Sequence, residues 1–448
     1  MRNPVLIALT SGGSIPLRPA AIALAALALV PVGRVHARPL SQPALWTTLA
    51  PAMTPAAGWT LRGLAAGPDG RLHLAPSTAP LACASADIDG GIASYDPAAG
   101  LCAGRDPYAA GSYGGRNYYN GARFHYGTLL SPPMSAAPFD QAIASWVAAT
   151  PPGTWLELHL RVRLETGGWT RWYDLPIWAS GSDAVRRHSV AGQSGVATVA
   201  TDTLVLHPGR TTTAYQLAAT LFTEGAASPA LRRLTLTTSR TATGVGDPPP
   251  PASAAWGNDL SVPGRSQMLA SYRGSAYGGG GEVWCSPTTT SMILAYWAHM
   301  LGRADLNQSV PLVAGGAYDW TYRGTGNWPF NVAYATSFAG MDGYVARFTS
   351  LSALEPWIAA RVPLALSIAF GAGELPGAPI SWSAGHLIVL RGFDRHGNPI
   401  VDDPAAPTDA TVRHVYPRAA LERAWLAGSD GTTYVIFPQG WTVPVLQA

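Results

Sequence analysis

The chain has 448 residues, enough for two domains that each bury a core of their own. Charged residues make up only 12%, and the 49 glycines and 39 prolines indicate a turn-rich, β-dominated protein rather than a helical bundle. The formal net charge of +3 is small and dispersed, which argues against a nucleic-acid partner.

The N-terminus carries an apolar block, PAAIALAALALVPVG at 19–33, preceded by Arg2 and Arg18 and followed by Val-His-Ala at 35–37. A block of about 15 residues is short for a membrane span and typical of a signal-peptide core. We predict a signal peptide over residues 1–37 and a mature chain that is secreted or at the cell surface, without a transmembrane region. An uncleaved membrane anchor is the alternative.

Three cysteines are present. Cys83 and Cys102 bracket a Gly-, Asp- and Pro-rich stretch, so in an exported protein we expect them to form a disulfide, which would add about 3 kcal/mol of stability. Cys285 is left without a partner. An odd cysteine in an oxidising compartment is usually buried or used.

Residues 38–240 are predicted to form an all-β domain of sandwich or jelly-roll type. From 156 to 164 apolar and charged residues alternate, which predicts a strand with one solvent-exposed face. Further strands are expected at 196–207, 214–222 and 231–238. Aromatic side chains in this domain would suit core packing or a groove for a cell-wall glycan or peptide: Tyr118, Tyr119, Trp169, Trp172 and Trp178.

Four prolines at 248–251 mark a predicted extended linker over 241–258, and residues 259–448 are predicted to form a second, α+β domain. A helix is expected directly after Cys285, with an apolar stripe through Met292, Ile293 and Tyr296. The other expected elements are a short helix at 350–361 and strands at 362–370, 385–394, 398–403 and 432–438.

Cys285 stands where the predicted helix begins. A thiol must lose its proton to act as a nucleophile, and the positive end of a helix dipole lowers its pKa. The backbone N–H of Cys285 would also face a developing oxyanion. Packing in the core beside Trp284 is the structural alternative.

Two further elements follow in the same domain. His386 opens an apolar strand after Gly385, and the acidic pair Asp402-Asp403 lies 16 and 17 residues later. A turn at 397–398 would form a hairpin that returns either acid to the imidazole, where it could fix the tautomer and stabilise the imidazolium. Each element alone has an ordinary structural explanation, but the three together indicate a nucleophile, a base and an orienting acid.

The blocks WCSPTTTSMILAYW (284–297), GHLIVLRGFD (385–394) and PIVDDPAAP (399–407) resemble the signatures of papain-like cysteine peptidases related to bacteriocin leader-processing peptidases. The layout, including TGNWPFNVAYATSF (325–338), is similar to secreted actinobacterial members with an upstream β domain. This resemblance implies a papain-like fold and a triad in which Cys285 is the nucleophile and His386 the general base, then acid. It favours Asp403 as the acid that orients His386, with Asp402 in reserve.

The family also places a glutamine before the cysteine as an oxyanion donor, which implies that role for Gln267 in VPGRSQ (262–267). Gln267 lies 18 residues before Cys285, farther than is usual, and the glycine run 278–281 would have to return the chain. Ser286 stands where the family commonly has glycine. The chain has no CxxC, HExxH or phosphate-loop motif, so we predict no metal and no cofactor.

We therefore predict a secreted cysteine peptidase that hydrolyses peptide or amide bonds of a peptide or protein substrate through an acyl-enzyme thioester. One alternative is a cell-surface glycan- or protein-binding protein whose peptidase domain is vestigial. Another is a cell-wall peptide amidase or transferase that uses the same triad.

Overall fold

A computed structural model of the chain describes residues 46–47, 58–76, 81–82, 102–105, 123–182, 185–241 and 253–444. The predicted signal peptide, Cys83, Tyr118, Tyr119 and most of the predicted linker lie outside these residues, and of Cys102 only the backbone is described. All described residues fall in one unit, Pro39–Ala448.

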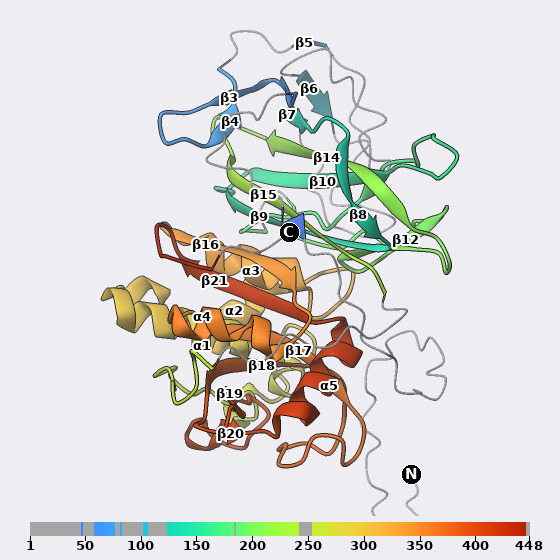
Figure 1. Cartoon of the computed structure of the whole chain (residues 1–448). Coiled ribbons are helices and arrows are strands. Elements are labelled where there is room, and N and C mark those ends of the chain that lie inside the picture. Colours follow the sequence, from blue (N-terminus) through green and yellow to red (C-terminus); the bar gives the residue numbers. More distant parts are fainter. Residues whose placement is uncertain are drawn as a thin grey trace, which may run out of the picture. The chain divides into compact units, whose positions relative to one another are not determined.

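Two sheets form the N-terminal part (Figure 1). One has the order β12 (Ala197–Ala200), β13 (Thr203–Leu206), β9 (Gln141–Ala149), β15 (Ala230–Ser239), β4 (Leu72–Leu74) and β3 (Leu64–Ala66), with β1 (Trp46–Thr47) paired to β15. The other has the order β11 (Tyr173–Asp174), β10 (Thr154–Val162), β14 (Thr212–Thr223), β7 (Arg123–Leu130), β6 (Cys102–Arg105) and β5 (Leu81–Ala82), with β2 (Thr60–Arg62) on β7 and β8 (Met134–Phe139) on β14. Side chains of both sheets share one buried cluster, as in a sandwich. The prediction of an all-β N-terminal part is confirmed.

The prediction of a solvent-exposed face over 156–164 is wrong for Glu157 and His159 of β10, although Arg163, directly after the strand, is exposed. Leu156, Leu158 and Leu160 face the sandwich core, but Glu157 and His159 on the other face are also buried. A second apolar cluster, which includes residues of the 172–190 segment, covers that face, and His159 Nδ1 lies 2.8 Å from Asp174 Oδ1. The alternation came from charged residues that are satisfied inside the protein, where burial requires a partner. Trp172 and Trp178 are likewise buried in the core.

The C-terminal part contains a six-stranded antiparallel sheet and five α-helices within the described residues. The strand order is β16 (Met341–Arg347), β21 (Thr432–Pro438), β17 (Leu364–Phe370), β18 (Ser383–Phe393), β19 (Pro399–Asp402) and β20 (Arg413–Val415). The helices are α1 (Cys285–Leu301), α2 (Val310–Ala317), α3 (Trp328–Thr336), α4 (Glu355–Ala359) and α5 (Arg418–Ser429), with short 3₁₀ helices η2 (Ala270–Tyr272), η3 (Gly281–Val283), η4 (Ala304–Leu306), η5 (Leu351–Ala353) and η6 (Asp409–Thr411). No helix in the described ranges is both long and apolar enough to cross a lipid bilayer.

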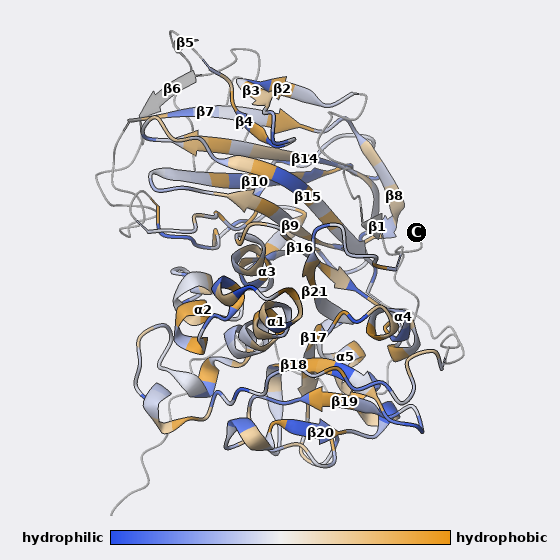
Figure 2. Cartoon of the chain, turned by 90° about the vertical axis from the view of Figure 1, so that its left-hand side faces the viewer, coloured by the Kyte–Doolittle hydropathy of each residue, from blue (hydrophilic) through white to orange (hydrophobic). Residues whose placement is uncertain are grey.

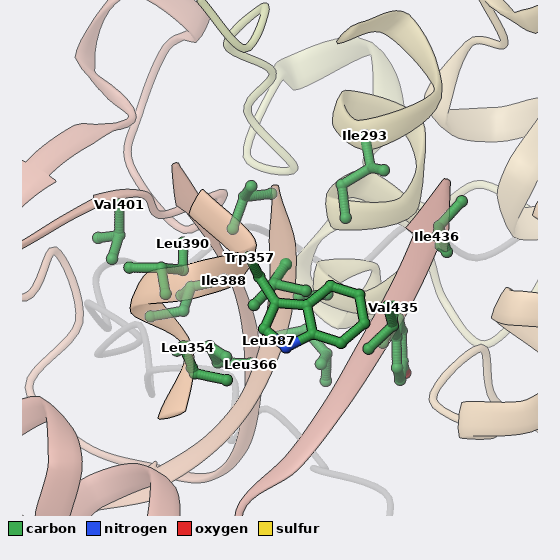
Figure 3. Packing of buried hydrophobic residues seen from close by; sticks show 14 of the residues in the cluster. Ile293, Leu354, Trp357, Leu366, Leu387, Ile388, Leu390, Val401, Val435 and Ile436 are labelled. Carbon is green, nitrogen blue, oxygen red and sulfur yellow. The ribbon is translucent and has the colours of Figure 1, made fainter. Parts of the chain in front are cut away.

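The core of this part gathers side chains from helices and strands around Trp357 of α4 (Figure 3). Ile293 of α1, Leu366 of β17 and Val435 of β21 belong to the same cluster. In Figure 2, α1 lies to the left of strands β17 and β21, and α4 lies to their right. The core therefore fixes the start of α1 relative to the sheet.

Helix α1 is buried on all sides from Ser286 to Trp297, which is more than the predicted stripe. Most of its hydroxyl residues satisfy their polar groups inside the protein, which makes this burial possible. Thr289 Oγ1 donates to the carbonyl of Leu387 on β18 at 3.1 Å, and Ser291 Oγ donates to the carbonyl of Gln308 at 2.8 Å. Small polar side chains thus anchor the helix to the strand that carries His386.

The two parts of the chain share a packed boundary. Helix α3 packs against both β9 and β16, and its Phe330 and Ala333 join the apolar cluster of the sandwich. At the outer edge of β16, Val345 N–H donates to Ser145 Oγ at 2.8 Å and its carbonyl accepts from Thr237 Oγ1 at 2.7 Å. The sandwich therefore satisfies backbone groups of an edge strand that would otherwise be open.

Candidate active site

Cys285 is the first residue of α1 and follows the 3₁₀ turn η3. The backbone N–H groups of Ser286 and Leu387 donate to its sulfur, and its side chain is hydrogen-bonded to His386. A helix N-terminus supplies unpaired N–H groups and positive potential, both of which favour a thiolate. Cys285 is half-buried and free of any disulfide.

A hairpin brings the predicted acid to the predicted base. Strands β18 and β19 pair antiparallel, and a turn at 394–398 joins them, as the glycine and asparagine there predicted. His386 Nε2 lies 2.7 Å from Asp403 Oδ1, and both residues are buried. Because Asp403 occupies Nε2, Nδ1 is the ring nitrogen left for Cys285.

The charges of Cys285, His386 and Asp403 stabilise one another. Burial alone would raise the pKa of the Cys285 thiol, but the hydrogen bond and positive charge of His386 outweigh it and hold that pKa below its ordinary value. Burial would lower the pKa of His386, yet the Asp403 carboxylate and Cys285 raise it well above its usual range. Burial opposes ionisation of Asp403 too, and His386 keeps its pKa low. The arrangement favours a thiolate, an imidazolium and a carboxylate.

The reserve acid, Asp402, faces elsewhere. Its two carboxylate oxygens lie 3.0 and 3.1 Å from Arg391 Nη1. The Nε of the same arginine donates to Asp259 Oδ1 at 2.7 Å. Burial raises the pKa of Asp402 to about 6, against the pull of Arg391. The structure thus brings Asp403, and not Asp402, to His386, because successive residues of a strand point to opposite sides.

Gln267 lies next to the turn that precedes Cys285. Its Nε2 donates to the carbonyls of Gly281 and Glu282 at 3.0 Å each, and its backbone N–H donates to Pro404 at 2.9 Å. The glycine run therefore does return the chain to Gln267. The oxyanion role of Gln267 stays a prediction, and it requires one amide N–H to leave a carbonyl.

The glycine run makes a tight contact between two backbone segments. A Cβ on Gly281 would lie 2.0 Å from the carbonyl oxygen of Gln267, and one on Gly280, whose φ is +105°, would lie 2.2 Å from that of Tyr272. Only glycine allows this approach of two backbones.

Two further hydroxyl groups lie in the site region, and of these Tyr416 carried no sequence signal. Tyr416 donates from its hydroxyl to Asp403 Oδ2 at 2.7 Å and is fully buried. The Ser286 hydroxyl lies 2.8 Å from that of Tyr434, so its polar group is satisfied where the family commonly has glycine. A lone tyrosine 13 residues after the acid has no diagnostic spacing. Within the described ranges, no group of three His, Cys, Asp or Glu side chains could hold a metal ion.

A thiol at a helix start, an imidazole and a carboxylate in one hydrogen-bonded row are the arrangement typical of cysteine peptidases. Comparison with known proteins points to the same class. Residues 84–239 match the family model described as the peptidase C39 N-terminal domain, in its actinobacterial form, and residues 259–432 match the Peptidase_C39 like family. The resemblance to C39-like peptidases with an upstream β domain is confirmed over both ranges.

Among solved structures, one described as a C39-like peptidase from Bacillus anthracis is 15% identical, covering 40% of this chain and 96% of its own, with a TM-score of 0.28. Another, the endo-1,4-beta-D-xylanase 10B of Clostridium thermocellum with its CBM22-1 and GH10 modules, complexed with xylohexaose, is 10% identical, covering 35% of this chain and 28% of its own, with a TM-score of 0.13. At these TM-scores neither likeness bears on function. No curated protein matches the chain.

Proposed function

We propose that the chain is a secreted or cell-surface cysteine peptidase with a papain-like catalytic domain, in which Cys285, His386 and Asp403 form the catalytic triad. The observation that carries the proposal is the continuous row from the sulfur through the imidazole to a buried carboxylate. The C39-like family match supports the peptidase class. Export is supported by the signal-peptide pattern of residues 1–37, and the disulfide between Cys83 and Cys102 is part of the same proposal.

In the first half-reaction the Cys285 thiolate attacks the carbonyl carbon of the scissile bond and forms a tetrahedral oxyanion. The backbone N–H of Cys285 at the helix start, together with Gln267, is the proposed donor set for that oxyanion. As the intermediate collapses, the C–N bond breaks and imidazolium His386 gives its proton to the leaving amine. The products are a thioester on Cys285, a free amine and neutral His386.

In the second half-reaction neutral His386 takes a proton from water, whose oxygen attacks the thioester carbonyl. Collapse of this intermediate releases the carboxylic acid and returns the thiolate and the imidazolium. Asp403 holds the ring so that Nδ1 faces the sulfur, and Tyr416 in turn holds Asp403. An acceptor other than water would make the same site a transferase.

The test uses two neighbouring, fully buried aspartates as a matched pair. Asp403→Asn should lower kcat/KM on a peptide library by on the order of 10³-fold or more, because the imidazole loses its orienting charge. Asp402→Asn should keep most activity, since it touches Arg391 and not His386. Cys285→Ala should abolish hydrolysis and labelling by iodoacetamide, with melting curves showing that each variant is folded.

A Cys285→Ala protein that hydrolyses peptides as fast as the wild type would end the proposal. Wild-type protein that labels at Cys285 but cleaves no member of the library would instead favour a vestigial peptidase domain in a binding protein.

A further inference from the structure

The loop between α2 and α3, residues 318–327, joins the β sandwich to the surroundings of Cys285. We define it as the α2–α3 loop. It belongs to the C-terminal part, yet it contacts the sandwich segment 185–202. Its position beside the nucleophile makes those contacts relevant to substrate binding.

On the sandwich side, Asp319 is the anchor of the loop. Its Oδ1 accepts from the backbone N–H of Ser189 at 3.1 Å and also from those of Thr321 and Tyr322, each at 2.9 Å. Its Oδ2 accepts from Asn327 Nδ2 at 2.9 Å. One buried carboxylate therefore holds both ends of the loop and ties them to the sandwich.

Further contacts fix the same loop from the sandwich. The backbone N–H of Trp320 donates to the carbonyl of Arg187 at 3.2 Å. The guanidinium of Arg186 lies 4.5 Å from the centre of a Trp320 ring. Where the loop ends, the N–H of Trp328 donates to Asp202 Oδ2 at 2.7 Å. The sandwich thus holds the loop at its start and at its end.

On the nucleophile side, the loop lies against the residues just before Cys285. Thr325 Oγ1 donates to the carbonyl of Val283 at 3.2 Å, and a Cβ on Gly278 would lie 3.3 Å from the carbonyl oxygen of Arg323. Partial burial and the charge of Cys285 both raise the pKa of Tyr322. Tyr322 is 39% exposed and Val283 is 51% exposed, so both present apolar surface beside the site.

We propose that Tyr322 is a specificity-determining residue that receives an apolar or aromatic side chain of the peptide substrate, and that the β sandwich positions it through the α2–α3 loop. This rests on the proposed peptidase function. The sandwich would then be a working part of the peptidase site rather than a separate binding module. Exposed apolar surface next to the reacting atom is where a peptide side chain can be buried on binding.

The test compares two alkylating agents on the full mature chain, so that it does not depend on turnover. One is a peptidyl chloromethyl ketone with phenylalanine next to the reactive group, and the other is iodoacetamide. The ratio of their rate constants at Cys285 isolates peptide recognition from thiol reactivity. In Tyr322→Ala this ratio should fall by about tenfold, the loss expected for one buried side-chain contact, while Tyr322→Phe should stay within about twofold of wild type.

The role of the sandwich is tested by Arg186→Ala, which removes an exposed cation over Trp320. It should lower the ratio by about two- to fivefold, the range of such a contact. The matched control is Arg210→Ala, an exposed arginine of the same domain, which should leave the ratio unchanged. Combined with Tyr322→Ala, Arg186→Ala should add nothing, because it acts through the tyrosine.

An unchanged ratio in Tyr322→Ala would overturn the proposal. An effect of Arg186→Ala equal with and without Tyr322 would overturn the role of the sandwich. If the ratio responds as expected but no peptide is hydrolysed, the proposed peptidase function fails and the peptide-binding role of Tyr322 stands.

Discussion

The Cys285 thiol and the His386 imidazole each stabilise the charged form of the other. The pKa of the thiol lies below its ordinary value and that of the imidazole above, although both groups are in a buried setting that opposes charge. An ion pair of this kind exists between the two pKa values: below the first the thiol is protonated, and above the second the imidazole is neutral. Activity should therefore follow a bell whose acidic limb reports Cys285 and whose alkaline limb reports His386.

The rate of iodoacetamide labelling against pH measures the acidic limb directly. In the wild type, its midpoint should lie below the ordinary thiol value of about 8.5. In His386→Ala, burial acts without the opposing charge, so the midpoint should move above that value. His299→Ala, an exposed histidine near the end of the same helix, is the control and should leave the midpoint in place. Equal midpoints in wild type and His386→Ala would show that the imidazole does not ionise the thiol.

The same shifts link the site to stability. His386 has a raised pKa, so its contribution to stability is complete below its unfolded value of about 6.5 and is lost as pH rises through the folded value. Asp403 has a lowered pKa, so its contribution is present above its unfolded value and is lost as pH falls. The His386–Asp403 pair therefore stabilises the fold most between the unfolded pKa of Asp403 and that of His386.

Elements in which the apolar residues form one clear pattern along the chain could be predicted from the sequence. Helix α1 and strands β17, β18, β19 and β21 lie close to their expected positions, and the turn at 394–398 gave the hairpin that joins His386 to Asp403. Helix α3 was not predicted as an element. The sandwich covers one side of it and β16 another, so its sequence lacks the polar face from which an amphipathic helix is recognised. The hydroxyl of Tyr416 was missed because a single polar contact has no period.

The 3₁₀ turn η3 is the element that sets Cys285 against Gln267, and two glycines of the run 278–281 separate two effects. Gly281→Ala would place a methyl group 2.0 Å from the carbonyl oxygen of Gln267 without any backbone penalty from positive φ. It should cost about 2–4 kcal/mol of unfolding free energy and most of the activity. Gly279→Ala meets nothing within 4 Å but has a φ of +109°, so it should cost only about 1 kcal/mol, or slightly more.

Chemical denaturation and peptide hydrolysis of both glycine variants distinguish the two effects. Equal losses in Gly279→Ala and Gly281→Ala would mean that the glycine run serves only its backbone conformation. In that case the approach to Gln267 would not be what places the nucleophile.

At the scale of the whole molecule, the two parts complete each other. Asp342 of β16 lies 2.8 Å from both Arg232 and Arg233 of the sandwich, and Val345 uses Ser145 and Thr237 as backbone partners. Helix α3 also buries apolar side chains in the sandwich cluster. A catalytic part separated from the sandwich would expose an edge strand, a buried carboxylate and an apolar helix face at once.

Residues 253–444 produced alone should therefore have a melting temperature at least about 10 °C below that of the mature chain. For a domain of this size, each kcal/mol of lost stability lowers the melting temperature by up to ~4 °C. Residues 253–444 should also associate, which size-exclusion chromatography with light scattering would detect. Residues 38–241 added in trans should restore part of the melting temperature, since binding to the folded state stabilises it. A monomeric 253–444 fragment with the melting temperature and peptide preference of the full chain would contradict both this prediction and the role of the sandwich at Tyr322. It would show that the α2–α3 loop keeps its position without Asp202, Arg186 and Ser189.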